Sequence, residues 1–575
     1  MPVAVFSAAP LNGPAPLTVQ FTDASTGRIS TWRWDFNNDG VIDSTARNPL
    51  HTYNTPGYYS VKLTVVGPYG TGEDIKNNLI IVNTKLEISS EYGNPNPPAG
   101  TRYYAPGGPV AAFIEQQISL GTGIRARCTG FSGTGSVPVN GDENSISFSI
   151  QTNSSLTWNW QVEYEVVTEV TPQNSGTLTI FPESTDEYYA SESMLTLQAV
   201  PNQDYWFDCW SGDLNGNINP ATLTVDSPKD IMAEFSRWKM LNTSLLSPRS
   251  GHTAVWTGTE IIIWGGYTYS DQAYYLSNGA KYCPETDTWT MLAACPVSGR
   301  CEHTAIWTGT EMIIWGGYCH DGSAVYLQDG AKYNPASDTW TVISLSPLLE
   351  RWRHTAVWTG TEMIVWGGYG NAQYYADGAS YNPENDTWTM IESSPLSNRN
   401  NHTAVWTGSG MIVWGGYGAG LYFSNGASYN PDDNTWSVIS NAPISARENH
   451  TAIWTGTEMI IWGGYNMNSR LADGARYNPL TNTWVVLRQS PLFGRYNHSA
   501  VWTGSRMVIW GGHGSGDAYF NDGAHYTPAS DTWTMLGDSI LSGRCEHSAL
   551  WIEDVMIIWG GISNEYYNDG AVCAP

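Results

Sequence analysis

One stretch of sequence recurs along the C-terminal part of the chain. "HTAVWTGTEIIIWGGY" at residues 252–267 returns as "HTAIWTGTEMIIWGGY" at residues 303–318. Its histidine recurs seven times, at spacings of 48 to 51 residues: His252, His303, His354, His402, His450, His498 and His547. Repeats of about 20–50 residues are typical of solenoids and propellers, because one unit cannot bury its apolar face without a neighbour. The repeat therefore restricts this region to a stacked array of like units.

Each copy has the pattern of four short strands. The first is "HTAVW", the second "MIIWGG", the third "DGAKYNP" and the fourth "DTWTML". The links "TGTE" and "NPETD" are short, so consecutive strands are expected to pair antiparallel. Alanine and glycine allow sheets to approach closely, and tryptophan fills the space between them.

These units resemble kelch repeats in the Gly-Gly pair that ends the second strand, the aromatic residue of the third and the tryptophan of the fourth. The resemblance implies a seven-bladed β-propeller over residues 237–575. The chain reaches "DGAVCAP" after a third strand, whereas "RWKML" at residues 237–241 stands alone before the first copy. We predict that Trp238 lies in an outer strand beside residues 569–573, which closes the ring and leaves no open edge.

The first 84 residues predict a small β-sandwich, with short alternating strands separated by Pro, Gly and Asn. "FSAAPLNGPAPLTVQFTDAS", "WRWDFNNDG" and "HTYNTPGYYSVKLTV" resemble a PKD domain, which implies an immunoglobulin-like extracellular spacer. The loop Asp35, Asn37, Asp39, Val41 and Asp43, with Gly40 at its turn, has the D-x-N-x-D-G spacing of a calcium loop. Its twelfth position is Ala46 rather than glutamate. Calcium and a plain polar turn both remain open.

Residues 85–236 are also β-patterned and contain a weak internal repeat. "TLTIFPESTDEYYASESMLTLQAVPNQDYWFDCWSGD" and the closing "DIMAEF" resemble an InlB-type B-repeat of bacterial surface proteins. We assign residues 165–236 to this module and residues 85–164 to a more divergent relative. Both resemble spacer or adhesion units, and neither contains a recognisable catalytic motif.

Charge argues against one class of partner. The chain has 26 Lys and Arg against 53 Asp and Glu, a net charge of -27. Nucleic acid is excluded as a partner, since phosphate binding needs clustered Lys and Arg. No apolar run approaches the roughly 18 residues of a membrane helix. The start "MPVAVFSAAP" reads as a strand rather than a signal peptide. The modules together predict an extracellular or cell-surface location.

Eight cysteines are scattered through the chain, and none forms a CxxC pair, which argues against zinc. An extracellular β protein favours disulfides, although buried thiols remain the alternative. Cys295, Cys301 and Cys319 are expected on one face of the propeller. We predict a bridge between two of them, with Cys301–Cys319 preferred.

Function is expected where the seven copies differ. The repeated histidines, and the arginines three residues before them, are interpreted as structural, with each arginine pairing the Asp or Asn that opens "DGA". The loops between second and third strands vary and are rich in tyrosine, which suits sugar rings and protein surfaces. The predicted binding residues are Tyr267, Tyr274, Tyr318, Tyr369, Tyr374, Tyr417, Tyr422, His320 and His513.

The sequence thus predicts an all-β, non-catalytic surface protein whose propeller recognises a glycan or a cell-surface or matrix protein, or copies of itself. Kelch-type propellers include polysaccharide lyases and copper-radical oxidases, so an enzyme is the alternative. A copper-radical site needs two histidines, tyrosines and a cysteine, for which His320, His513 and Cys319 form only a sparse set. A structural subunit of an extracellular fibre is the third possibility.

Overall fold

The computed structural model describes residues 1–269, 272–320, 322–467 and 469–575. Its regular elements are all β-strands, which confirms the all-β prediction. Within these residues no helix is long and apolar enough to cross a membrane. The chain forms two compact units: Met1–Val200 with Cys209–Glu234, and Pro201–Asp208 with Phe235–Pro575.

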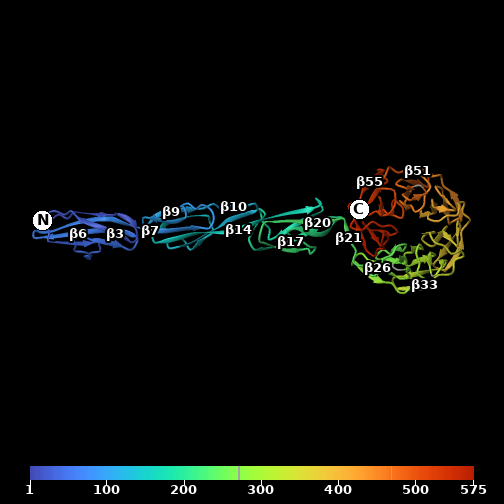
Figure 1. The fold of residues 1–575 in the computed structure, drawn as a ribbon, viewed down its shortest axis with the longest axis horizontal. Helices are drawn as coiled ribbons and strands as arrows, with labels where there is room; N and C mark the ends of the chain where they lie inside the picture. The colour runs from blue at the N-terminus through green and yellow to red at the C-terminus, as the bar shows by residue number, and fades with distance from the viewer. Residues whose placement is uncertain (270–271, 321, 468) are drawn as a thin grey trace. The chain divides into compact units, whose positions relative to one another are not determined.

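The second unit contains seven four-stranded antiparallel sheets among its described residues, arranged as blades around a ring (Figure 1). We name the strands of each blade A, B, C and D in their order across the sheet. The A strands are β22 (Thr253–Trp256), β28 (Thr304–Trp307), β34 (Thr355–Trp358), β40 (Thr403–Trp406), β46 (Thr451–Trp454), β52 (Ser499–Trp502) and β56 (Ser548–Ile552). The B strands are β23 (Ile261–Trp264), β29 (Met312–Trp315), β35 (Met363–Trp366), β41 (Met411–Trp414), β47 (Met459–Trp462), β53 (Met507–Trp510) and β57 (Val555–Trp559).

The outer half of each blade follows the same scheme. The C strands are β26 (Gly279–Cys283), β32 (Gly330–Asn334), β38 (Gly378–Asn382), β44 (Gly426–Asn430), β50 (Gly474–Asn478), β54 (Gly523–Thr527) and β58 (Gly570–Cys573). The D strands are β27 (Thr288–Met291), β33 (Thr339–Val342), β39 (Thr387–Met390), β45 (Thr435–Val438), β51 (Thr483–Val486), β55 (Thr532–Met535) and, for the last blade, β21 (Trp238–Met240).

The ring is closed at both its inner and its outer strands. Each A strand contacts the A strands of the two neighbouring blades, and β22 of the first blade contacts β56 of the last. At the outside, β21 pairs antiparallel with β58, with Trp238 opposite Cys573. This confirms the predicted closure by the strand that contains Trp238.

The B strands explain why the repeated apolar run does not alternate with polar residues. All four residues of β23 are buried, because both faces of the blade are covered by neighbours. Ile261 and Ile263 pack in one cluster with residues of the last blade. Ile262 and Trp264 pack against Met312 and other residues of the second blade. The core of the propeller therefore lies between blades.

The first unit consists of three consecutive β modules. The first has strands β1 (Phe6–Ala9), β2 (Asn12–Pro14), β3 (Leu17–Asp23), β4 (Thr31–Asp35), β5 (Leu50–Tyr53) and β6 (Gly57–Gly67). The chain continues through β7 (Gly70–Ser90) into the second module, which has strands β8 (Gly100–Tyr104), β9 (Gly108–Phe113), β10 (Gln117–Gly121), β11 (Ile124–Thr134), β12 (Asn140–Gly141) and β13 (Ser145–Ile150). Beyond β14 (Ser154–Thr171) lie β15 (Gly176–Phe181), β16 (Tyr188–Ala190), β17 (Ser193–Pro201), β18 (Trp206–Gly212), β19 (Ala221–Val225) and β20 (Lys229–Ser236).

Two long strands run from one module into the next. The first half of β7 pairs with β6, and its second half pairs with β8 and β14. Likewise β14 pairs with β11 over Ser155–Tyr164 and then, in parallel, with β20 over Val166–Thr171. Consecutive modules within this unit therefore share a hydrogen-bonded strand instead of a linker.

Candidate functional site

The repeated histidines form a closed ring of hydrogen bonds inside the propeller. Each Nε2 lies 2.8–3.0 Å from the hydroxyl of the Thr or Ser that begins strand A of the adjoining blade. His303 also packs edge-on against Trp264, at 5.1 Å between ring centroids. Burial lowers the pKa of every one of these histidines, so they are neutral at physiological pH. The prediction of a packing and hydrogen-bonding role is confirmed.

The repeated arginines are also structural. The side chain of Arg351 is fully buried: Nη1 donates to the carbonyl of Gly367 at 3.0 Å and to Asp377 Oδ1 at 2.8 Å, and Nε donates to the carbonyl of Leu349. Equivalent contacts bind the other six arginines to the Asp or Asn before each "GA". The arginines therefore fasten the loop after strand B to the loop before strand A.

The residue before each repeated histidine lies at the mouth of the ring. Seven residues occupy this position: Gly251, Glu302, Arg353, Asn401, Asn449, Asn497 and Glu546. All have φ between 51° and 60°, in the left-handed region. Six backbone hydrogen bonds of 3.0–3.3 Å link each of these residues to the one before it, from Glu302 N to Gly251 O through to Glu546 N to Asn497 O. We call these seven residues the mouth ring.

Four consecutive positions of the mouth ring hold three charged residues and one glycine. The order is Glu546, Gly251, Glu302 and Arg353. Glycine and asparagine tolerate the left-handed conformation, whereas other L-residues adopt it at a cost of about 1–2 kcal/mol each. Arg353 Nε lies 3.8 Å from Glu302 Oε2, and its guanidinium lies over the Trp352 ring at 4.1 Å. Both glutamates are partly exposed.

A cavity of about 260 Å³ opens on these residues. Its lining consists of six mouth-ring residues and four of the repeated histidines. They are Gly251, Glu302, Arg353, Asn449, Asn497 and Glu546, with His252, His303, His498 and His547. Glu546 accepts a hydrogen bond from Asn497 Nδ2 at 3.1 Å. Burial and the nearby charge of Glu302 raise the pKa of Glu546 to about 7. The floor of the mouth therefore holds two carboxyl groups, and that of Glu546 has a raised pKa.

Aromatic side chains surround this floor. Most of them belong to five hairpins between strands B and C: β24 (Tyr267–Tyr269) with β25 (Ala273–Tyr275), β30 (Tyr318–His320) with β31 (Ala324–Tyr326), β36 (Tyr369–Gly370) with β37 (Gln373–Tyr374), β42 (Tyr417–Gly418) with β43 (Leu421–Tyr422), and β48 (Tyr465–Asn466) with β49 (Ser469–Arg470). Tyr496 lies in the loop before β52, and His513, Tyr519 and Tyr566 lie in the B–C loops of the last two blades. Neighbouring rings contact one another at 4.6–6.0 Å in the order Tyr566, Tyr267, Tyr275, Tyr318, Tyr326, Tyr369, Tyr374, Tyr417, Tyr422, Tyr465, Tyr496, His513 and Tyr519. We call this series the aromatic annulus.

A second cavity, of about 240 Å³, joins the annulus to the floor. Its walls include Tyr267, Tyr275, Tyr318 and Trp352. It shares Gly251, Glu302, Arg353 and Glu546 with the first cavity. Flat aromatic faces and charged groups thus converge on one space, the arrangement expected of a small-ligand site.

Most of the predicted tyrosines belong to the annulus. Tyr267, Tyr318, Tyr369 and Tyr417 begin the first strand of a hairpin, and Tyr374 and Tyr422 lie opposite two of them. The loops differ in length at the tip, yet this cross-strand position is the same in each. Tyr274 pairs with Thr268 and points to the exposed side, and Tyr275 takes the annulus position.

The two predicted histidines lie in different environments. His513 is in the annulus: its Nδ1 lies 2.5 Å from the Tyr496 hydroxyl, and its ring stacks on Tyr519 at 4.6 Å. His320 is exposed on the second blade, at the end of β30. Three blades lie between it and His513 in chain order, and neither histidine belongs to a cluster of three His, Cys, Asp or Glu ligands in the described part of the chain. The residues of the copper-radical alternative are therefore not brought together.

The predicted disulfide among Cys295, Cys301 and Cys319 is not formed. None of the eight cysteines is in a disulfide within the described ranges. Cys301 lies directly opposite Tyr318, so Cys319 is one residue out of register with it. Successive side chains of a strand point to opposite faces, which directs the Cys301 and Cys319 thiols apart. Burial raises the pKa of the Cys301 thiol, as expected of a packed, unreactive cysteine.

The predicted calcium loop is held together by its own backbone amides. Asp35 accepts hydrogen bonds from Asp39 N and Gly40 N, at 3.1 and 2.8 Å. Asp39 Oδ1 accepts from Val41 N at 2.8 Å, and Asp43 Oδ2 from Phe36 N at 2.6 Å. Asn37 donates to Asp39. Each carboxylate thus has a protein partner in this conformation, and calcium binding by Asp35, Asn37, Asp39, Val41 and Asp43 stays a prediction.

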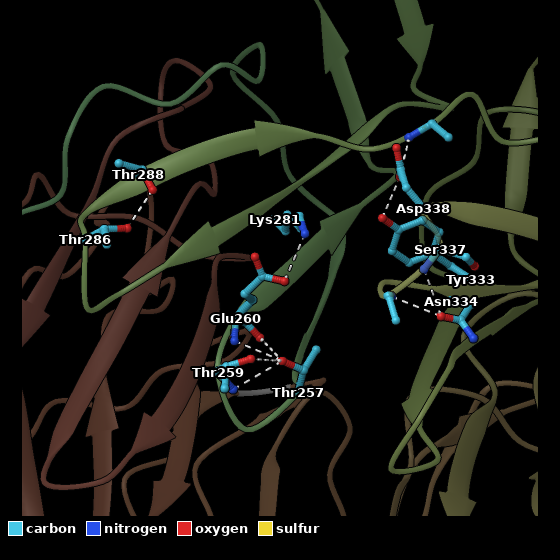
Figure 2. Close-up of polar contacts among 12 residues, drawn as sticks. Thr257, Thr259, Glu260, Lys281, Thr286, Thr288, Tyr333, Asn334, Ser337 and Asp338 are labelled. Atoms are coloured by element: carbon cyan, nitrogen blue, oxygen red, sulfur yellow. Dashed lines mark hydrogen bonds and ion pairs between the residues drawn. The ribbon is translucent and has the colours of Figure 1, made fainter.

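The opposite face of the propeller shows why its loops are nearly identical between copies. Thr257 Oγ1 accepts hydrogen bonds from Thr259 N and Glu260 N and so holds the A–B turn (Figure 2). Glu260 pairs with Lys281 at 3.2 Å. In the C–D turn Asp338 accepts from the Tyr333 hydroxyl at 2.7 Å (Figure 2). Each repeated polar residue thus stabilises a turn.

Sequence reasoning missed Glu302, Arg353 and Glu546. A signal was present, because the two residues between each repeated arginine and histidine differ between copies while the arginine and the histidine do not.

Three family models match this chain. The "KLHDC2/KLHL20/DRC7 Kelch-repeats domain" matches residues 251–443 and 401–574, the "PKD domain" residues 2–81, and the "Divergent InlB B-repeat domain" residues 166–239.

Individual relatives share much less. Kelch-like protein 15 of Danio rerio and that of Homo sapiens are each 28% identical over 96 residues, which cover 16% of this chain and 15% of theirs. A solved structure titled "Structure of YjhT" aligns with 51% of this chain and 99% of its own, at 16% identity and a TM-score of 0.41. The kelch match spans more than half of the chain, preceded by a PKD domain and a divergent InlB B-repeat: this protein belongs to the kelch-repeat family.

Proposed function

We propose that this chain is a non-catalytic, modular protein of the cell surface or extracellular space whose propeller mouth binds a glycan. The observation that carries the proposal is the aromatic annulus around a polar, charged floor. Sugars present C–H faces that pack on aromatic rings and hydroxyls that hydrogen-bond to carboxylates and amides, and the mouth offers both.

The N-terminal modules support the location and a spacer role. PKD domains and InlB B-repeats are typical of extracellular proteins, and the net charge of -27 opposes binding to nucleic acid. The shared strands β7 and β14 leave no unpaired linker between consecutive modules of the first unit. Such a unit suits the presentation of a binding domain away from an anchor.

A glycan array probed with the full chain tests this proposal. We expect retention of a defined set of glycans, lost by at least tenfold in affinity when Tyr318 and Trp352 are replaced by alanine, as is usual for aromatic anchors. Thr259→Ala on the opposite face is the matched control. A chain that retains no glycan, or whose retention survives both substitutions, contradicts a binding site at the mouth.

A catalytic role on polysaccharide is the second candidate, and Glu546 favours it. A carboxyl group with a raised pKa beside a second carboxyl group in one aromatic cavity suits general acid and base catalysis. Product analysis of retained polysaccharides by chromatography decides between the two. New reducing or unsaturated ends that disappear in Glu546→Gln would establish an enzyme.

A further inference from the structure

The floor of the mouth holds two carboxyl groups, those of Glu302 and Glu546, and one cation, Arg353. Arg353 is engaged by Glu302 and by the face of Trp352. Among the ion pairs of the described residues none includes Glu546, whose hydrogen bond from Asn497 comes from a neutral amide. The buried arginines Arg249 and Arg544 are committed to the loops of their own blades.

The placement of these charges is not required by the propeller. The equivalent position is glycine in one blade and asparagine in three, both of which suit its left-handed backbone. Glu302 and Glu546 adopt that conformation at a cost, and the repulsion between them adds to it. Gly251 lies between them and contributes no side chain, so it leaves open the space that both carboxylates face.

The walls of the same space also favour a cation. Tyr267, Tyr275, Tyr318 and Trp352 line the upper cavity, which shares Glu302 and Glu546 with the lower one. Aromatic faces attract ammonium groups and also stack on the apolar face of a sugar ring. The two cavities overlap, and their volumes of about 260 and 240 Å³ lie close to the lower end of the size range of small-ligand pockets, about 300–1,000 Å³.

We propose that the mouth binds a sugar bearing a free primary amine, whose ammonium group lies between Glu302 and Glu546 while its ring packs on Tyr318 and Trp352. This inference rests on the proposed glycan-binding function and narrows its ligand to amino sugars. The ligand must then carry a positive charge, which a neutral glycan lacks.

Calorimetry with a matched pair of ligands tests the inference. The probes are a β-1,4-linked glucosamine tetramer and its fully N-acetylated counterpart, which differ only in the amine. At neutral pH we expect the full chain to bind the amine tetramer at least tenfold more tightly. Raising the salt concentration should weaken this binding, because it depends on charge.

Variants of the mouth ring assign the effect to its residues. Glu302→Asn and Glu546→Asn introduce the residue that three other blades have at this position, so the backbone conformation is preserved. The double variant should lose at least tenfold in affinity for the amine tetramer and keep its affinity for the acetylated one. Glu458→Gln, on the opposite face, should bind as the parent chain does.

The possible failures are distinguishable. Equal binding of both tetramers, or binding unchanged in the double variant, overturns the amino-sugar inference and leaves glycan binding intact. If neither tetramer binds while other glycans on the array do, the amino-sugar inference is likewise overturned and glycan binding stays intact. Failure of every glycan overturns the inference together with the proposed function.

Discussion

Ser548 Oγ and His252 Nε2 lie 3.0 Å apart, although 296 residues separate them in the chain. Ser548 begins the A strand of the last blade, and His252 directly precedes that of the first. The same contact joins every other pair of adjacent blades, so this hydrogen bond is the one that completes the inner ring. At the outer strands, the pairing of Trp238 with Cys573 closes the ring of blades a second time.

The outer closure predicts a local dependence on Trp238. This side chain is 3% exposed and packs against Trp510 at 5.9 Å. Trp238→Ala should reduce the free energy of unfolding by about 3–5 kcal/mol. Deletion of residues 237–241 should lower the melting temperature by several degrees. Met240→Ala, in the same strand but exposed, is the control, and calorimetric melting that is equal in Met240→Ala and Trp238→Ala contradicts the closure.

The inner ring predicts a steep loss of stability in acid. The pKa of each ring histidine is lowered on folding, for His354 to about 3, so the folded state stays neutral where the unfolded chain takes up protons. Stability is therefore complete above the ordinary histidine pKa of about 6.5 and falls as the pH decreases below it. Glu546 and Glu448, whose pKa values are raised by burial, act in the opposite direction, but they are two groups against seven.

Urea unfolding between pH 7 and pH 5.5 measures this dependence, since most carboxylates titrate lower. Each histidine contributes a slope of up to about 1.4 kcal/mol per pH unit. The double variant His354→Asn with His402→Asn should be less stable at pH 7. Its free energy of unfolding should also depend less steeply on pH, by the contribution of two histidines. An unchanged slope would show that the ring histidines are protonated in the folded state.

The buried arginines predict a strict requirement for the guanidinium group. Arg351→Met should destabilise by about 3–5 kcal/mol, because it leaves Asp377 and the Gly367 carbonyl without their donors. Arg351→Lys should recover only part of this loss, since one ammonium cannot reproduce the fork. The exposed Arg506→Met provides the baseline. Full recovery by lysine in urea unfolding contradicts the role of the fork.

The fold was predictable from sequence and the floor of the site was not, for a physical reason. Seven copies of "HTAVW" and "MIIWGG" encode the same local packing seven times, so the pattern identifies the blade. Glu302 and Glu546 are 244 residues apart in the chain. They meet only because the ring closes, and their charge matters only through the cavity between them. Tyr274 and Tyr275 could not be distinguished, because the hairpin register decides which one faces inward.

The cysteine register makes a simple chemical prediction. Cys301 forms an isolated bridge with Tyr318, which leaves Cys319 of β30 one residue out of register with it. Peptide mapping of the denatured, alkylated chain without reductant should find both residues alkylated, on separate peptides. A peptide pair linked through Cys301 and Cys319 contradicts the register.

The shared strands of the first unit predict resistance to proteolysis between its modules. Lys85 lies within β7, paired with Tyr103, and Glu163 lies within β14, paired with Arg125. Glu163 is also held by Arg125 and Arg127, at 2.7 and 2.8 Å. A protease needs an extended, unpaired segment, and neither residue lies in one.

Limited digestion with trypsin and with a glutamate-specific protease checks this directly. We expect no early cleavage after Lys85 or Glu163, in contrast to chains joined by flexible linkers. Insertion of four Gly-Ser residues after Thr84 interrupts the pairing of β7 and should make Lys85 an early trypsin site, which serves as the positive control. Early cleavage after Lys85 in the unmodified chain would mean that β7 opens readily between modules and that this part of the first unit is a hinge rather than a spacer.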